Sequence, residues 1–283
     1  MRRECLPRLQ CPIGCSDPLQ LQEQEGTPER IETGTLACGG CGARYPIERG
    51  IPRMLPPDLS GTKAPDLALD PLEAERKLSE MRARDEQVAA YDRMWYLNWF
   101  GKLETPATLR RLDLQPRHDL LEAGCGTGRL TRQFASRCRS MVSVDFSWES
   151  LLVCSEKLRR TGVTNVDLVQ ADICRLPFRS ETFDRAISCQ VLEHIPTVAS
   201  RAAAVQSIAR TTTPGGTLVL SAYQYSALTR WFGPKEGEHA GGIYYYRFRR
   251  RELQELLSTA WSVQEITGAL VYHFIARCRK ESR

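Results

Sequence analysis

Short apolar runs alternate with longer amphipathic stretches over the last two-thirds of the chain. The apolar runs have the length and the Val, Leu, Ile and Ala content of buried strands, and they cover 119–122, 141–145, 166–173, 183–191, 217–221, 262–268 and 271–277. Helical periodicity separates the first five runs. This alternation predicts an α/β fold whose parallel sheet is covered by helices on both faces.

A long amphipathic helix is expected ahead of the first strand, between Leu72 and Leu103. Its apolar side chains recur at intervals of three, four and seven residues, at Leu78, Met81, Val88, Tyr91 and Trp95, and a cluster of Tyr96, Trp99 and Phe100 follows. These aromatic residues either pack the helix onto the sheet or line a pocket beneath it. Prolines and Gly61 interrupt residues 55–71, so no regular element is expected there.

A glycine-rich turn follows the first strand and has the form Glu122-x-Gly124-x-Gly126-x-Gly128. A dinucleotide-binding turn would instead read G-x-G-x-x-G. Glycines allow a sharp turn and a close approach by a ligand, and a helix start behind the turn presents free N–H groups to an anion. With an acid two residues ahead of the first glycine, the stretch suits an amino-acid zwitterion, whose ammonium meets Glu122 and whose carboxylate meets the turn.

This stretch resembles the first motif of the class I S-adenosylmethionine-dependent methyltransferases, of the methyltransferase type 11-like kind. The resemblance implies a Rossmann-like, mostly parallel sheet of seven strands and S-adenosylmethionine as methyl donor. The implied cofactor-binding residues of the motif are Glu122, Gly124, Cys125, Gly126 and Gly128. Helices ahead of the first strand form a lid in this family, which makes Tyr91 a candidate lining residue.

The ends of the next two strands supply further cofactor candidates. Asp145 ends the second strand, where its two carboxylate oxygens can accept from both ribose hydroxyls, and Phe146 can stack on the adenine. Asp172 ends the third strand and is placed to accept from the adenine amino group. The backbone N–H of Ile173 can bond a ring nitrogen.

The fourth strand leads into Gln190-Val-Leu-Glu193-His194, which resembles the family's fourth motif. The backbone near Gln190 is expected beside the methionine part of the cofactor. Glu193 and His194 are either catalytic, with His194 as proton acceptor, or they hold the loop by hydrogen bonds. The aromatic, glycine-broken segment 223–246 reads as a loop that shapes an acceptor pocket for a planar or lipid-like molecule, or for a flipped-out base.

Cysteines concentrate at the front of the chain, with five of the eleven in the first 41 residues. Cys11 and Cys15 form one close pair and Cys38 and Cys41 another, and the four thiolates can make a tetrahedral shell for zinc. The segment looks like the zinc-ribbon-like domain that precedes the catalytic domain in some bacterial methyltransferases. Its first pair is spaced C-x3-C rather than C-x2-C, which leaves Cys5 as a substitute ligand. A ribbon that keeps its shape without metal is the alternative.

Composition and charge set the remaining bounds. The 283 residues are 42% hydrophobic and 26% charged, as is ordinary for a globular protein, and the net charge of +5 permits nucleic acid as a partner without arguing for it. The first residues lack the apolar core of a secretory signal, and no run is long enough to span a bilayer. A cytoplasmic protein without a membrane span is expected. The expected organisation is a ribbon domain over 1–56, a linker over 57–71 and a methyltransferase domain over 72–283.

Three functions are compatible with these motifs. The preferred one is methyl transfer to a small aromatic or lipid-like acceptor. The alternatives are methylation of ribosomal or transfer RNA, with the ribbon helping to bind it, and a cofactor-binding scaffold without turnover. The acceptor, the methylated atom and the oligomeric state stay open.

Overall fold

A computed structural model of the chain describes residues 1–60, 71–91, 105–239, 242–269 and 272–282. The main feature is a sheet of seven strands in the order β12-β13-β9-β8-β5-β6-β7. These strands are β5 (Asp119–Ala123), β6 (Ser140–Asp145), β7 (Val166–Gln170), β8 (Phe183–Cys189), β9 (Thr212–Tyr223), β12 (Ser262–Ala269) and β13 (His273–Arg279). The first five pair in parallel, and β13 runs antiparallel to both β9 and β12. The predicted α/β fold with a Rossmann-like, mostly parallel sheet is confirmed.

Helices cover both faces of the sheet, which explains why every residue of β5 is buried. Leu120 packs with Phe134 of α4 (Thr131–Ala135) and with α5 (Trp148–Arg160). Its neighbour Leu121 points to the opposite face, which is covered by α6 (Val198–Thr211) and α7 (Arg250–Ser258). A strand buried on both sides carries a continuous apolar run rather than an alternating one.

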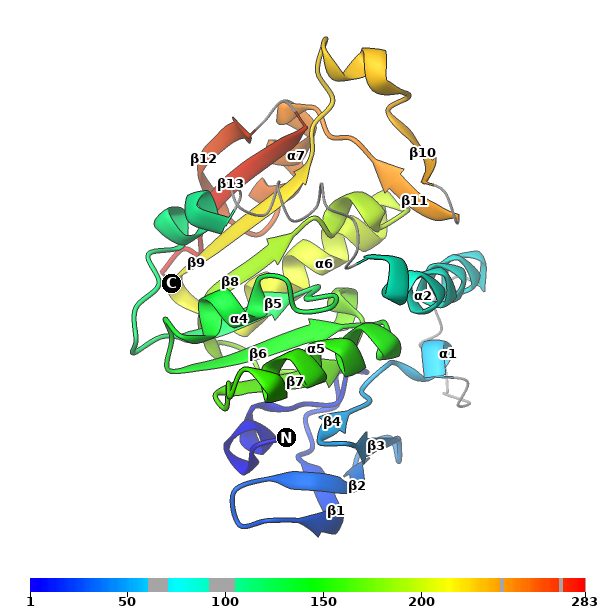
Figure 1. Ribbon diagram of the computed structural model, residues 1–283, viewed down its shortest axis with the longest axis vertical. Helices are drawn as coiled ribbons and strands as arrows, with labels where there is room; N and C mark the ends of the chain where they lie inside the picture. Colours follow the sequence, from blue (N-terminus) through cyan, green and yellow to red (C-terminus); the bar gives the residue numbers. More distant parts are fainter. Residues whose placement is uncertain (61–70, 92–104, 240–241, 270–271, 283) are drawn as a thin grey trace.

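The first 56 residues form a small antiparallel sheet that packs below the edge strand β7 (Figure 1). It follows the 3-10 helix η1 (Arg3–Arg8) and contains β1 (Leu19–Gly26), β2 (Ile31–Cys38), β3 (Arg44–Glu48) and β4 (Ile51–Pro52). Arg2 forms an ion pair with the buried Asp167 at 2.8 Å, and the backbone N–H of Met54 donates to the carbonyl of Gln170 at 2.7 Å. This small sheet therefore docks on the large one through specific contacts. The domain boundaries at 56 and 71 stay a prediction.

Two expected irregular segments contain regular structure. Helix α1 (Pro57–Ser60) occupies the start of the expected linker, because a proline is well tolerated in the first turn of a helix. The expected loop 223–246 contains the 3-10 helix η4 (Thr229–Phe232) and a hairpin of β10 (Glu236–His239) and β11 (Ile243–Tyr246). The expectation of loops was wrong at both places.

Helix α2 (Pro71–Tyr91) confirms the expected helix over the part of it that the structure describes. Its buried face differs from the expected one: Lys77 is only 8% exposed, whereas Leu78 and Met81 are half-buried. The side chain of Tyr91 and residues 95–100 lie outside the described residues. Among the helices that the structure describes, none is both long and apolar enough to cross a membrane.

Candidate active site

A cavity lies over the carboxyl ends of β5, β6, β7 and β8. Helix α2 lies beside these strand ends (Figure 1). Nine of the residues expected to bind the cofactor line this cavity, namely Glu122, Gly124, Cys125, Gly126, Asp145, Phe146, Asp172, Ile173 and Gln190. Carboxyl ends of parallel strands meet at one edge of the sheet, so residues far apart in the sequence gather there. The structure brings these nine residues together, whereas Gly128 does not line the cavity. The side chain of Tyr91 lies outside the described residues.

Glu122, the next-to-last residue of β5, is a buried carboxyl held by two hydroxyl groups. The hydroxyls of Thr131 and Ser143 both donate to Oε2, at 2.6 Å and 2.8 Å. Burial raises the pKa of Glu122 to about 7, although the two hydrogen bonds and the charge of Arg129 oppose this shift. A cationic group that entered the cavity would favour the ionised form.

Asp145 at the end of β6 is tied to the glycine turn. Its Oδ2 accepts from the N–H of Gly126 at 2.7 Å, and its Oδ1 accepts from the N–H of Ser147 at 3.0 Å. Burial raises the pKa of Asp145, against the effect of these backbone donors. The backbone N–H of Gly126, which was expected to face a ligand, therefore donates to Asp145 instead. The helix behind the turn begins only at Thr131.

Asp172, two residues beyond the end of β7, binds partners on two sides. It accepts from the N–H of Cys174 at 2.9 Å and forms an ion pair with Lys77 of α2 at 2.7 Å. Burial alone would lower the pKa of Lys77, but the charge of Asp172 raises it above its ordinary value. Helix α2 is thus fastened to the acid that was expected to meet the adenine.

The glycines of the turn have different surroundings. A Cβ on Gly124 would lie 2.3 Å from Val191, and one on Gly128 would lie 2.5 Å from the sulfur of Cys154. A Cβ on Gly126 would meet nothing within 4 Å. Gly124 and Gly128 therefore allow close packing within the protein, and Gly126 borders open space in the cavity.

Sequence reasoning missed the polar face of α2. Lys77, Glu80, Arg84 and Gln87 all line the cavity, and their spacing of three and four residues places them on one face of the helix. Burial raises the pKa of Glu80 to about 7, although Arg84 forms an ion pair with it at 3.3 Å. The same periodicity was visible in the sequence, but only its apolar members were considered.

Beyond β8, the chain turns sharply at Gln190 and enters the 3-10 helix η3 (Leu192–His194). Gln190 has a φ of 59°, a strained conformation for a residue other than glycine, and such strain is often found at functional sites. His194 lines the cavity, whereas Glu193 is completely buried and does not. The two residues named as catalytic candidates thus have different surroundings.

His194 is held in one tautomer by the β11 backbone. Its Nδ1 lies 2.8 Å from the carbonyl oxygen of Tyr244. Because a carbonyl only accepts, Nδ1 carries the hydrogen, and the neutral ring has its lone pair on Nε2. Burial, and then the charge of Arg84, lower the pKa of His194 well below its ordinary value, so the ring is neutral at pH 7.

Aromatic rings surround His194. Tyr223 of β9 lies 5.7 Å from it and His239 of β10 lies 6.0 Å from it, between ring centroids. Tyr245 stacks against His239 at 4.6 Å. The β10–β11 hairpin therefore borders the histidine end of the cavity.

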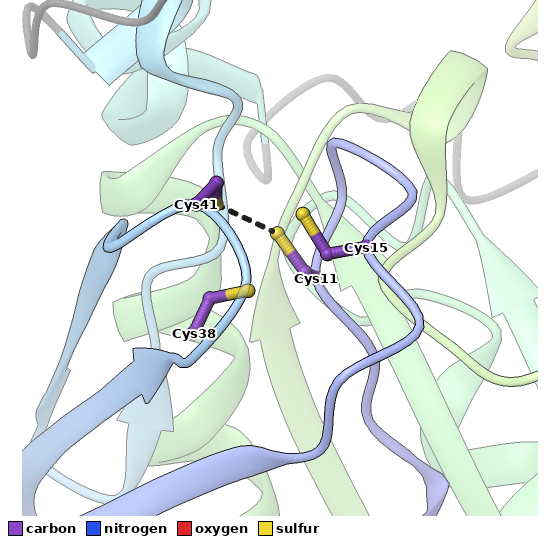
Figure 2. Close-up of side chains that lie close together, drawn as sticks. All are labelled: Cys11, Cys15, Cys38 and Cys41. Carbon is purple, nitrogen blue, oxygen red and sulfur yellow. Dashed lines mark hydrogen bonds between the residues drawn. The ribbon is translucent and has the colours of Figure 1, made fainter.

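The four paired cysteines of the front segment converge on one point (Figure 2). All four sulfur atoms lie within 4.8 Å of one another, and those of Cys11 and Cys41 are 3.7 Å apart. A tetrahedral zinc with Zn–S bonds of about 2.3 Å needs sulfur atoms about 3.8 Å apart, so the cluster fits such an ion. Cys5 is buried and does not belong to the cluster, so the wider C-x3-C spacing needs no substitute ligand.

Comparison with known proteins supports the assignment of the fold and the family. Residues 121–220 match a family model described as a methyltransferase domain. The chain is 32% identical over 117 residues to a tRNA (carboxymethyluridine(34)-5-O)-methyltransferase of Arabidopsis thaliana, which covers 40% of this chain and 27% of that protein. It is 27% identical over 169 residues to a 2-heptyl-1-hydroxyquinolin-4(1H)-one methyltransferase of Mycobacteroides abscessus, covering 59% of this chain and 69% of that protein.

A solved structure gives a similar result. The 1,6-didemethyltoxoflavin-N1-methyltransferase of Burkholderia thailandensis, with bound S-adenosylhomocysteine, superposes with a TM-score of 0.62 at 18% identity, over 77% of this chain and 95% of that one. Five of the matched curated relatives are covered over only 3–48% of their own length. Residues 121–220 therefore form a methyltransferase domain, and the strand order of the sheet agrees with this match.

Proposed function

We propose that this protein transfers the methyl group of S-adenosylmethionine to a small aromatic or lipid-like acceptor. The observation that carries the proposal is the convergence of Glu122, Asp145 and Asp172 on one cavity beside Gly126. Three acids at successive strand ends suit the ammonium, the ribose and the adenine of a single nucleoside. The open space at Gly126 allows the nucleoside to approach the backbone of the turn.

The bound cofactor would supply an electrophilic methyl group on a sulfonium. The chain's own task is then to hold the acceptor in line with that methyl and to exclude water. Phe146 and Ile173 line the cavity between Asp145 and Asp172 and would enclose the adenine. The strained backbone at Gln190 borders the space left for the methionine part.

The acceptor end of the cavity is largely apolar. Val88, Val191, Ile195 and Ile243 line it, and the aromatic cluster of Tyr223, His239 and Tyr245 borders it. Such a wall favours a planar or lipid-like molecule. The Mycobacteroides abscessus relative is named for a heptyl-substituted hydroxyquinolone, an acceptor of this kind.

We assign His194 the role of proton acceptor. Its Nδ1–H bond to Tyr244 leaves the lone pair on Nε2, and the ring lines the cavity. Glu193, which is buried away from the cavity, would position the loop instead. A base is needed only for an acceptor that must lose a proton.

We further propose that Cys11, Cys15, Cys38 and Cys41 bind one structural zinc ion. The geometry of the four sulfur atoms supports this, and metal binding would add folding energy to a module with a small core of its own. A cytoplasmic location and the division into 1–56, 57–71 and 72–283 are part of the same proposal.

Transfer to RNA is the second candidate. It is favoured by the identity to the Arabidopsis thaliana tRNA methyltransferase and by a ribbon that could contact a large substrate. Incubation with labelled S-adenosylmethionine and cell extract, followed by separation into RNA, protein and small molecules, decides between the candidates. Label in the small-molecule fraction is expected. Label in RNA would support the second candidate, and binding without labelling would support a scaffold without turnover.

The cofactor assignment is tested by titration calorimetry with S-adenosylhomocysteine. Asp145→Asn should weaken binding more than about tenfold, because the carboxylate loses its charge-assisted bonds to the ribose. Asp167→Asn is the matched control, since Asp167 is an equally buried acid on the neighbouring strand that pairs with Arg2 outside the cavity. Equal affinity in the Asp145 variant and the wild type would remove the basis of the proposal.

A further inference from the structure

Arg84 is a cation of α2 that the cofactor contacts proposed above do not use. Its Nη2 reaches Oε1 of Glu80 at 3.3 Å, which is a long contact for an ion pair. Its Nε is buried and, within the described part of the chain, has no hydrogen-bond partner. The side chain is 23% exposed and lines the cavity. The guanidinium is therefore partly open to the cavity, and among the described residues it is held only by the long contact to Glu80.

The charge of Arg84 acts on the acceptor end of the cavity. It contributes to the lowered pKa of both His194 and His239, after the effect of their burial. Arg129, the other arginine among the lining residues, acts on Glu122 instead. The charge of Arg84 also opposes the rise in the pKa of Asp145, so it reaches both the histidine end of the cavity and the expected ribose site.

The neighbours of Arg84 at this end leave its charge incompletely balanced. Val88, Ile195 and Ile243 are apolar, and His194 is neutral. Among the residues that the structure describes, Glu80 is the acid that pairs with Arg84, and burial raises the pKa of Glu80 to about 7. A bound sulfonium would add a second positive charge nearby. A fixed cation beside apolar and neutral groups stabilises negative charge that develops on an acceptor oxygen at this end of the cavity.

We infer that the acceptor is an apolar aromatic molecule with a weakly acidic hydroxyl, a phenol or an enol, whose oxygen is held by Arg84 and methylated. The inference rests on the proposed function and specifies its substrate class. The hydroxyl proton goes to Nε2 of His194, and the oxygen uses a lone pair to bond the methyl carbon. The carbon–sulfur bond breaks and leaves its electron pair on sulfur, so a methyl ether, a thioether and a protonated imidazole result.

A neutral His194 near a cation favours a hydroxyl over other kinds of acceptor group. A carboxylic acid is already ionised at neutral pH and needs no base. An amine that gains a methyl group becomes more basic and would carry a cation toward Arg84. A hydroxyl needs both a group that takes its proton and a cation that stabilises its oxyanion, and the cavity offers both within one wall.

The test uses para-nitrophenol, whose neutral and ionised forms absorb at different wavelengths. With the full-length protein saturated with S-adenosylhomocysteine, the pKa of the bound probe should fall by about one unit or more, as expected for an acid beside a fixed cation. Arg84→Gln should abolish this fall and Arg84→Lys should retain part of it. Arg82→Gln is the control, because Arg82 is an exposed arginine on the same helix. Umbelliferone, read by the fluorescence of its anion, serves as a larger second probe.

Calorimetry with S-adenosylhomocysteine separates the failure of this inference from the failure of the proposed function. The Arg84→Gln variant should bind S-adenosylhomocysteine within about twofold of the wild type. A tenfold loss would place Arg84 on the cofactor and overturn the inference. Normal cofactor binding with no ionisation of either probe would overturn it too, while leaving the proposed function intact. If the wild type does not bind the cofactor, the proposed function itself is wrong.

Discussion

At the scale of single residues, the glycine motif contains positions with different tasks. Gly126 and Gly128 both have a positive φ, of 51° and 81°. Of these two glycines, only Gly128 lies against a neighbouring side chain: a Cβ at this position would be 2.5 Å from the sulfur of Cys154. An alanine substitution at each of the two positions therefore distinguishes an effect on ligand binding from an effect on packing.

Gly128→Ala should lower the free energy of unfolding by about 2–4 kcal/mol, because it combines backbone strain with overpacking against Cys154. Gly126→Ala should lower it by only about 1–2 kcal/mol, from strain alone, yet weaken S-adenosylhomocysteine binding more than about tenfold. Urea unfolding and calorimetry measure the two effects. An Ala at Gly126 that leaves cofactor affinity unchanged would contradict the assignment of this glycine to the ligand.

The pKa of Glu122 makes stability depend on pH. Burial raises this pKa from 4.5 to about 7, so between those values the folded chain keeps a proton that the unfolded chain releases. The unfolded state binds fewer protons in this range, and the free energy of unfolding therefore falls as pH rises from about 4.5 to about 7. The contribution is present in full below the unfolded-state pKa and amounts to about 3 kcal/mol at most.

Urea unfolding of the cofactor-free protein at several pH values checks this prediction. Glu122→Gln should flatten the slope, and Glu80→Gln should flatten it further, because burial also raises the pKa of Glu80 to about 7. Glu86→Gln, an exposed residue of α2, should leave it unchanged. An equal slope in the wild type and the Glu122 variant would mean that Glu122 is ionised in the folded protein.

At the scale of elements, sequence periodicity located the strand ends correctly, but it did not identify the buried face of α2. The strands place Asp145 and Asp172 at one sheet edge because parallel strands share their direction. Helix α2 turns its charged residues toward the cavity, and Lys77 forms an ion pair with Asp172. A helix beside a charged cavity buries polar residues that match it, so an apolar stripe alone does not identify the buried face.

The cysteine cluster is the second element-scale feature, and it predicts one equivalent of zinc. Cys38→Ser should remove the metal, because a three-sulfur shell binds it more weakly, and should destabilise the small sheet. Cys5→Ser is the control. Cys5 is buried and close to Cys11 in the sequence, but its sulfur does not belong to the cluster, so the variant should still bind one zinc ion per chain. Atomic emission spectroscopy measures the zinc content of both purified variants and of the wild type. A metal-free wild type would support a ribbon that folds without zinc.

At the scale of the whole molecule, the small sheet and the large sheet share one hydrophobic core. Leu9, Met54 and Phe178 belong to a single cluster with the face of the large sheet that α6 and α7 cover. Leu9 also pairs by a backbone bridge with Phe178. Parts that share a core generally unfold together.

We therefore expect a single unfolding transition in calorimetry. Chelation of zinc should lower its midpoint as a whole, and S-adenosylhomocysteine at a hundred times its Kd should add about 2.7 kcal/mol to the free energy of unfolding. Intrinsic fluorescence and circular dichroism should follow the same curve. Two separate transitions, with only the first sensitive to chelation, would instead favour residues 1–56 as an independent domain.

Local sequence patterns were enough to predict the seven strands of the large sheet, the glycine turn, the acids near the strand ends and the two cysteine pairs. These features depend on local patterns, and the direction of a parallel sheet then brings Glu122, Asp145 and Asp172 together. The buried face of α2, the contacts of Asp145 with the turn, the tautomer of His194 and the shared core of the front segment became known only from the folded chain. Each of these depends on contacts between residues far apart in the sequence, and no local period specifies which partner a side chain meets.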